Sequence, residues 1–280
     1  MNLVVSHWSA NPAVLAAVAV VAAVYLRGAW ALRPVPAQAV AFSAGLLLVV
    51  VALAAPVGYW ARHYMWVRSV QDLLLAVVVP SLIVLGAPWE ALARGIGQRL
   101  PPRPDRDYQS PAWLSWPVAV TVAFNVAWWA WHVPALYDAA LRHPAVYAAQ
   151  TVIYLGVGIA FWLQLIGSGP VTPRFPPLPR VMLITGTMAS GTVLAMMLAF
   201  GSGLLYPAYL PAGRRPGSVL WDQNLAGAVL WLLALPPLII TAVALLIRWL
   251  NEENRQALAA GLDRLLTPSR PAWPSRPGRT

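Results

Sequence analysis

The sequence RSVQDLLLAVVVPSLIVLGAP, residues 68 to 88, joins a polar start to a long apolar run. A helix of this length spans the roughly 30 Å of hydrocarbon in a bilayer, so the run predicts a membrane-crossing helix. Its first turns carry Arg68, Gln71 and Asp72 on one face, although charged side chains are rare in helices that enter lipid. This stretch therefore indicates both the class of fold and the first candidate for a site.

Six further apolar runs of similar length occupy most of the chain. They cover about 12 to 31, 37 to 56, 112 to 131, 144 to 166, 179 to 199 and 223 to 248. Of the 280 residues, 59% are apolar and only 10% are charged, far from the balance of a soluble domain. We therefore expect an all-α, polytopic membrane protein, a bundle of seven transmembrane helices.

The arginines predict the orientation of this bundle, because cytoplasmic loops carry an excess of positive charge. All 19 basic residues are arginine. If the N-terminus lies outside, fourteen of them fall on cytoplasmic segments: Arg27, Arg33, Arg94, Arg99, Arg103, Arg106, Arg174, Arg180, Arg248, Arg255, Arg264, Arg270, Arg276 and Arg279. We expect the N-terminus outside and the C-terminus in the cytoplasm. Arginine without lysine, with abundant alanine, is typical of a GC-rich bacterial genome. For a multi-pass helical protein of a bacterium we expect the inner cell membrane.

The chain divides into a transmembrane domain over residues 1 to 250, a cytoplasmic or interfacial helix over 251 to 266, and a disordered Pro/Arg-rich tail over 267 to 280. The first apolar run lacks a basic leader and is expected to be a retained helix. The arginines are dispersed over short loops, which argues against nucleic acid and favours lipid headgroups as their partner. The absence of lysine excludes a retinal Schiff base.

Prolines inside the apolar runs predict local distortion. Pro80 denies the carbonyl of Ala76 its usual partner, and Pro236 and Pro237 do the same for Leu232 and Leu233. We expect kinks in the third and seventh helices.

The uncommon polar side chains of several helices fall at the outer end of the predicted bundle. We interpret them as the lining of an outer vestibule, a site open to the outside. Its expected members are Arg68, Gln71, Tyr137, Tyr147, Gln150, Thr151, Asp222 and Gln223, together with the candidate metal ligands Asp72, His132, His143, Met196 and Met197. Imidazole and thioether groups suit Cu(I), which makes copper the metal to consider.

Five segments resemble the CtaG family of cytochrome c oxidase assembly factors, seven-helix bacterial membrane proteins associated with maturation of the copper centre of haem-copper oxidases. They are VQDLLLAVVVPSLIVLGAP (70 to 88), WHVPALYDAAL (131 to 141), HPAVYAAQTVIYLGVGIAFW (143 to 162), LLYPAYL (204 to 210) and DQNLAGAVLW (222 to 231). The resemblance implies a non-enzymatic assembly role, with an oxidase subunit or another membrane protein as partner.

The chain departs from this family at its histidines. Where the family pattern has two histidines entering the third helix, this chain has Arg68 and Asp72, and Tyr147, Gln150 and Thr151 stand where the fifth helix would carry histidines and a glutamate. Arginine stays protonated and repels a cation. We therefore expect a degraded metal site, in which an ion pair between Arg68 and Asp72 occupies the space of a metal.

Two functions remain open on the sequence. The first is a membrane-embedded assembly factor for a haem-copper oxidase, as the resemblance implies. The second is a transporter of a small ion or solute, in which Asp72 and Asp222 would serve as ion sites at the outer end. We do not expect an enzyme, because the chain has no cysteine nucleophile and neither an H-E-x-x-H nor a G-x-S-x-G motif.

Overall fold

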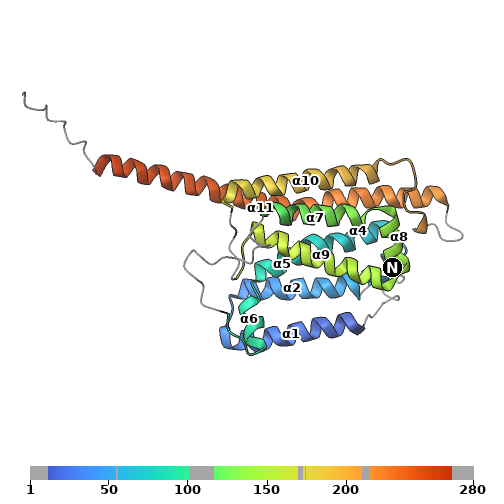
Figure 1. Ribbon diagram of the computed structural model, residues 1–280, viewed down its shortest axis with the longest axis horizontal. Helices are drawn as coiled ribbons and strands as arrows, with labels where there is room; N and C mark the ends of the chain where they lie inside the picture. The colour runs from blue at the N-terminus through green and yellow to red at the C-terminus, as the bar shows by residue number, and fades with distance from the viewer. Residues whose placement is uncertain are drawn as a thin grey trace, which may run out of the picture.

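The computed structural model describes residues 12–54, 56–100, 117–169, 173, 175–209 and 215–266, and helices are its main elements (Figure 1). The helices are α1 (Pro12–Leu32), α2 (Pro36–Leu53), α3 (Pro56–Trp60), α4 (Met65–Leu73), the π-helix η1 (Leu74–Val78), α5 (Val79–Gly86), α6 (Trp89–Gly95), α7 (Pro117–Trp131), α8 (Pro134–Arg142), α9 (Pro144–Leu165), α10 (Pro177–Ala199), the short 3-10 helix η2 (Pro207–Tyr209) and α11 (Pro216–Leu266). The expected all-α class is confirmed.

Six helices of the described chain are long and apolar enough to cross a membrane. Their bounds are Pro12–Leu32, Pro36–Trp60, Met65–Gly86, Pro144–Leu165, Pro177–Ala199 and Gly217–Ala259. The remaining apolar run appears as α7, a shorter helix of 15 residues, and its expected start at residues 112 to 116 lies outside the described residues. The expected tail, residues 267 to 280, also lies outside them.

Proline decides where most of these helices begin. Eight of the α-helices have proline as their first residue, including α7, α9 and α11. Proline suits this position because its missing N–H would have no partner in the first turn and its fixed φ is helical. The prolines of this sequence therefore mark the first residues of most of the helices that contain the apolar runs.

The long helices lie side by side, with α10 and α11 along one edge of the bundle and α1 along the other (Figure 1). α4, α5 and α9 form the centre, where α9 packs against α5 and α11 packs against α4. α1 is held by α6 and α2. The helix α11 continues through residues 251 to 266 and projects beyond the bundle (Figure 1).

The central span contains the π-helical turn η1 directly before Pro80. Proline cannot donate to the carbonyl four residues earlier, and a π-turn is one way for a helix to accommodate that loss. Gly158 of α9 lies against this turn: a Cβ added to it would meet the Ala76 carbonyl oxygen at 2.5 Å. By contrast, α11 runs through Pro236 and Pro237 as one continuous helix.

Candidate functional site

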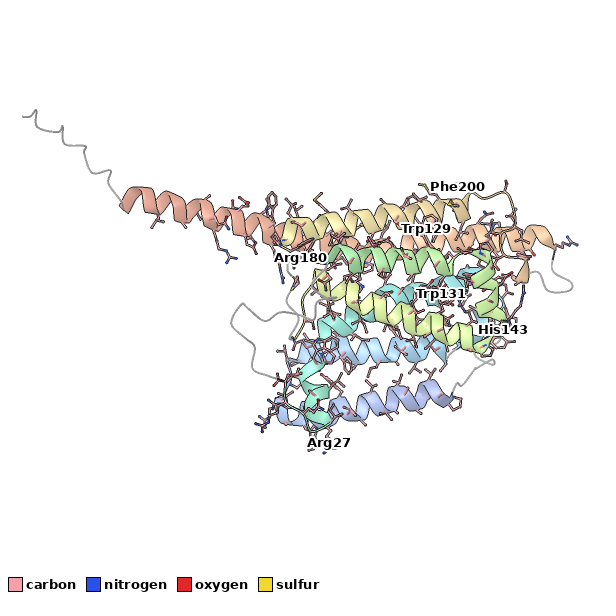
Figure 2. The ribbon with its side chains drawn as sticks, viewed as in Figure 1. Arg27, Trp129, Trp131, His143, Arg180 and Phe200 are labelled. Carbon is pink, nitrogen blue, oxygen red and sulfur yellow. The ribbon has the colours of Figure 1, made fainter. Side chains whose placement is uncertain are left out.

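The predicted polar residues gather at one end of the bundle. α8 and the beginnings of α4, α9 and α11 all lie at that end (Figure 1). Figure 2 places Trp131 and His143 there, whereas Arg27 and Arg180 lie at the opposite end. The helices alternate in direction, so residues that are distant in sequence meet at this end.

The centre of the site is a buried ion pair between Arg68 and Asp72 of α4. Arg68 Nε lies 3.2 Å from Asp72 Oδ1, and each side chain is only 2% exposed. The two residues are four apart on one helix, so their side chains lie on the same face. Because removal of two charges from water is costly, such a pair needs further polar contacts to compensate.

Arg68 obtains these contacts from α8 and α9. Its guanidinium donates a hydrogen bond to Gln150 Oε1, 82 residues further along the chain. Its Cζ atom lies 4.8 Å from the ring centroid of Tyr147 and 5.8 Å from that of Tyr137. Rings at these distances attract a cation through their quadrupole. We call Arg68, Asp72, Gln150, Tyr137 and Tyr147 the Arg68 cluster.

Gln71 joins this cluster to α2. Its Nε2 donates to the backbone carbonyl of Ala52 at 2.6 Å and to the hydroxyl of Tyr147 at 2.9 Å. Thr151, expected beside it, donates to the carbonyl of Tyr147 on its own helix at 3.0 Å. Gln71 thus links α2, α4 and α9, whereas the hydrogen bond of Thr151 stays within α9.

His132 lies buried just after α7. Its Nδ1 is 2.7 Å from the carbonyl oxygen of Trp128. Because a carbonyl can only accept, Nδ1 carries the proton and Nε2 carries the lone pair. Burial lowers the pKa of His132 to about 4, and the positive charge of Arg68 adds to this effect. His132 is therefore neutral at physiological pH.

The loop after α10 closes over the site with two tyrosines. The hydroxyl of Tyr206 donates to the carbonyl of His132 at 2.6 Å, and that of Tyr209 donates to the carbonyl of Ala61 at 2.9 Å. Their rings lie 4.5 Å and 6.1 Å from the ring of Tyr137. Tyr209 was not a candidate from the sequence. The motif LLYPAYL contains it, but an aromatic residue in a loop gives no signal of a buried contact.

The DQN sequence at the start of α11 binds backbone groups. Asp222 accepts hydrogen bonds from the backbone nitrogens of Met65 at 3.0 Å and Trp66 at 3.2 Å, the first two residues of α4. Gln223 binds the backbone of Leu205 and Gly203. Asn224 donates to the carbonyls of Leu198 and Gly201. These three side chains fix the start of α4 and the loop after α10.

The candidate site residues are mostly buried, so the structure encloses them where the sequence suggested an open vestibule. Arg68, Gln71, Asp72, His132, Tyr137, Gln150, Asp222 and Gln223 are all buried. Three other candidates lie at the surface: His143 is exposed, and Met196 and Met197 are 44% and 54% exposed. The structure therefore brings Asp72 close to Arg68 and buries His132, but it turns the two methionines outward.

The residues at this site are a poor match for a copper ion. Asp72 is already paired with the guanidinium of Arg68, whose fixed charge repels a cation. Within the described part of the chain, no group of three or more His, Asp or Glu side chains could hold a metal ion. Among the described residues of the site, His132 Nε2 is a neutral nitrogen donor. Metal binding through Asp72, His132, His143, Met196 and Met197 stays a prediction.

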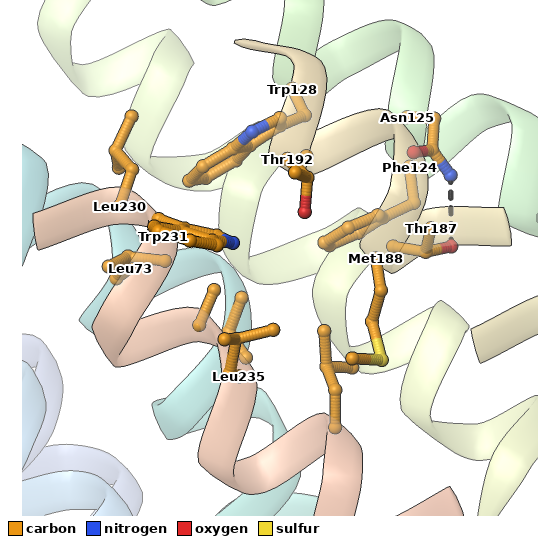
Figure 3. Close-up of a pocket in the computed structure, with 14 residues that line it drawn as sticks. Leu73, Phe124, Asn125, Trp128, Thr187, Met188, Thr192, Leu230, Trp231 and Leu235 are labelled. Carbon is orange, nitrogen blue, oxygen red and sulfur yellow. Dashed lines mark hydrogen bonds between the residues drawn. The ribbon is translucent and has the colours of Figure 1, made fainter. Parts of the chain in front are cut away.

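A separate pocket opens between α7, α10 and α11 (Figure 3). The empty space there, open solvent included, is about 490 Å³, and Leu73 and Val77 of the central span are among the residues that line it. Most of its lining is apolar, and its amide Asn125 donates to Thr187 Oγ1 at 3.1 Å. Because Asn125 and Thr187 bind each other, this pocket offers few polar contacts to a ligand.

The chain resembles three uncharacterized mycobacterial proteins. A protein of Mycobacterium leprae (strain TN) is 26% identical over 230 residues, which are 78% of this chain and 35% of that protein. Proteins of Mycobacterium bovis and Mycobacterium tuberculosis (strain CDC 1551 / Oshkosh) are each 25% identical over 277 residues, 91% of this chain and 41% of the relative. The chain thus spans less than half the length of these relatives. No solved structure matches it.

A family model described as cytochrome c oxidase caa3 assembly factor matches residues 23–252. This range includes every residue of the Arg68 cluster, His132 and the DQN sequence. Because the match extends over most of the chain, the protein belongs to the cytochrome c oxidase caa3 assembly factor (Caa3_CtaG) family.

Proposed function

We propose that this protein is a non-enzymatic assembly factor for a haem-copper cytochrome c oxidase in a bacterial inner membrane. The observation that carries the proposal is the family match over residues 23–252, which includes the whole buried polar site. The six long apolar helices of the described chain support a membrane location. An oxidase subunit that is itself embedded in the membrane is the partner these helices would contact.

We further propose seven transmembrane spans, with α7 as the shortest and the N-terminus outside. The distribution of arginine supports this orientation. Arg27 and Arg180 lie at the end of the bundle opposite His143 (Figure 2), and Arg248 of α11 is close enough to Arg180 to interact with its charge. If the arginine-rich end faces the cytoplasm, the Arg68 cluster faces the outside.

In this proposal the protein acts through helix contacts, and its internal ion pair takes the place of a metal. The buried guanidinium of Arg68 supplies the positive charge among α4, α8 and α9 that a cation would otherwise supply. The same charge makes the site unfavourable for copper. The protein would therefore stabilise or orient an oxidase subunit without carrying copper in this cluster.

Deletion of the gene in its host tests the assembly role. We expect oxidase activity to fall while the oxidase subunits are still synthesised, and we expect the wild-type gene to restore activity. Haem and copper content of the purified oxidase then shows which step has failed. A strain with normal oxidase activity but impaired uptake or export of a solute would contradict the proposal and support the transporter function.

A complementation series distinguishes a structural role of Asp72 in the ion pair from a role of Asp72 in copper handling. The deletion strain receives either the wild-type gene or a gene encoding Asp72→Asn, which keeps the shape of the side chain and removes its charge. We expect the variant to lower the amount of folded assembly factor and the oxidase activity in parallel. Normal amounts of folded variant together with an oxidase that lacks only copper would show that Asp72 handles the metal.

A further inference from the structure

Two arginines from different helices come together at the end of the bundle opposite the Arg68 cluster. Arg180 lies in the first turn of α10, and Figure 2 places it at that end. α10 packs along α11, and Arg248 of α11 is close enough to Arg180 for the two charges to interact. Because like charges repel each other, a fold that brings these two together favours an anion beside them.

Hydrogen bonds to two carbonyl groups hold the guanidinium of Arg180 in place. Its Nη1 donates to the carbonyl oxygen of Leu165, the last residue of α9, at 2.9 Å, and its Nε donates to that of Pro176 at 3.4 Å. Its Nη2 takes part in neither of these bonds. Because a guanidinium has several N–H donors in one rigid plane, Arg180 can bind both carbonyls and still offer donors to a phosphate.

The acidic side chains of the described residues do not balance the two arginines. Glu252, one helical turn after Arg248 on α11, has a carboxylate whose charge reaches Arg180. The first turn of α10 contains no acidic residue, and within the described part of the chain no ion pair includes Arg180 or Arg248. Glu252 thus offsets one of the two positive charges, which leaves a net positive charge for a ligand.

The neighbouring side chains indicate that this charge lies where the helices meet lipid. Leu178 and Met182 of α10 and Ile247 of α11 are each at least 40% exposed. Trp249, which follows Arg248, is half-buried, and tryptophan is enriched at the level of the lipid headgroups. Exposed apolar side chains favour a ligand that has acyl chains, because inorganic phosphate buries no apolar surface.

We propose that Arg180 and Arg248 bind the phosphate group of an anionic phospholipid, whose acyl chains pack against α10 and α11. A phosphate accepts paired hydrogen bonds from a guanidinium plane and supplies the missing negative charge. Basic pockets between membrane-spanning helices are typical sites for anionic headgroups. Phosphatidylcholine brings a cation of its own and would compensate the arginines less well. The proposal rests on the proposed membrane location and is independent of the role in oxidase assembly.

Native mass spectrometry of the full-length protein, freed of lipid in detergent, tests this site. Phosphatidylglycerol, phosphatidylcholine and inorganic phosphate are added in separate titrations. We expect phosphatidylglycerol to bind more tightly than phosphatidylcholine, and we expect no tight binding of inorganic phosphate. Equal affinity for the two lipids would contradict the proposal. Tight binding of inorganic phosphate by itself would show that the site takes free phosphate instead of a lipid.

Substitutions of single arginines test the location of the site. Arg248→Gln changes an exposed side chain, and we expect about fivefold weaker binding of phosphatidylglycerol, the typical effect of one cation near the headgroups. Arg180→Gln should weaken binding at least as much, with circular dichroism as the check that α9 and α10 stay folded. Arg27→Gln is the matched control, because Arg27 is exposed at the same end of the bundle but on α1 (Figure 2).

The control distinguishes a defined site from general attraction to a positive surface. We expect Arg27→Gln to bind phosphatidylglycerol as the wild type does. If Arg27→Gln and Arg248→Gln lose affinity equally, or if Arg248→Gln loses none, the two arginines do not form a lipid site.

Discussion

The carboxylate of Asp222, at the start of α11, lies 3.0 Å from the backbone nitrogen of Met65, the first residue of α4. The backbone nitrogens in the first turn of a helix lack partners within the helix, and the helix dipole favours a negative charge there. Capping groups normally come from the residue just before the helix. Here the cap comes from 157 residues away, so one side chain joins the start of α4 to α11.

Replacement of Asp222 by alanine should therefore destabilise the bundle. The change removes the acceptor from the buried N–H of Met65 and from the partly buried N–H of Trp66, and we expect a loss of about 1–2 kcal/mol in the free energy of unfolding. Chemical denaturation in detergent, followed by circular dichroism, measures this loss. The variant Asp222→Asn keeps an acceptor without the charge and should lose less. An unchanged free energy of unfolding in Asp222→Ala would show that the cap is dispensable.

A second prediction concerns the contribution of the buried ion pair between Arg68 and Asp72 to the stability of the fold. Asp72→Ala leaves the guanidinium of Arg68 buried without its counter-charge, which typically costs about 3–5 kcal/mol. The double substitution Arg68→Met/Asp72→Leu replaces both charges with apolar groups and should recover much of this loss. A double-mutant cycle measures the coupling between the two residues. Strictly additive losses would contradict a direct pairing in the folded protein.

The wild-type protein should not depend on copper for its stability. Because Arg68 supplies a permanent positive charge at the centre of the site, we expect no stoichiometric copper after copper loading and gel filtration, measured by mass spectrometry of the metal. The melting temperature should also be the same with and without a Cu(I) chelator. Tight stoichiometric copper that disappears in Asp72→Ala would contradict the substitution of an ion pair for a metal.

The contact between α9 and α5 depends on the absence of a side chain at Gly158. In Gly158→Ala, the new Cβ would meet the Ala76 carbonyl oxygen at 2.5 Å and Pro80 Cγ at 2.6 Å, so the helices must separate. We expect a loss of about 1–3 kcal/mol in the free energy of unfolding. Gly156→Ala on the same helix is the matched control, because its Cβ would have no neighbour within 4 Å. Equal effects of the two substitutions would show that close packing at Gly158 is unimportant.

The buried histidine predicts how stability changes with pH. The pKa of His132 is lowered by burial to about 4 in the folded protein, against an ordinary value of 6.5. Between these two pKa values the unfolded chain binds the proton more tightly than the folded protein does. The contribution of the neutral His132 to stability is therefore complete above pH 6.5 and is lost as the pH falls toward 4. The loss contributed by this residue is roughly 3 kcal/mol at most.

Denaturation curves between pH 7.5 and 4, a range set by the two pKa values, measure this effect. The variant His132→Asn retains a donor for the carbonyl of Trp128 and cannot titrate, so its stability should depend less steeply on pH. His143→Asn, at an exposed histidine, is the matched control for the loss of an imidazole. If His132→Asn and the wild type lose stability in parallel, the buried imidazole is not the group responsible.

Much of this fold could be predicted from local sequence. Six of the apolar runs give described helices long enough to cross a bilayer, and in most of them a proline at the first residue marks where the helix begins, as at Pro144 and Pro177. The alternating direction of successive helices then puts the polar ends of the third, fifth and seventh runs on one side. The pairing of Arg68 with Asp72 also follows from their spacing of four residues.

Only the tertiary structure decided what these side chains contact. Helical periodicity tells which residues share a face of one helix, but it does not tell how that helix is rotated against its neighbours, and the π-turn at Leu74–Val78 shifts the face within a single span. For this reason the bond from Arg68 to Gln150, the cap from Asp222 on α4 and the outward position of Met196 could not be read from the sequence. The sequence determined the helices and their polar ends, and the packing of one helix on another determined the site.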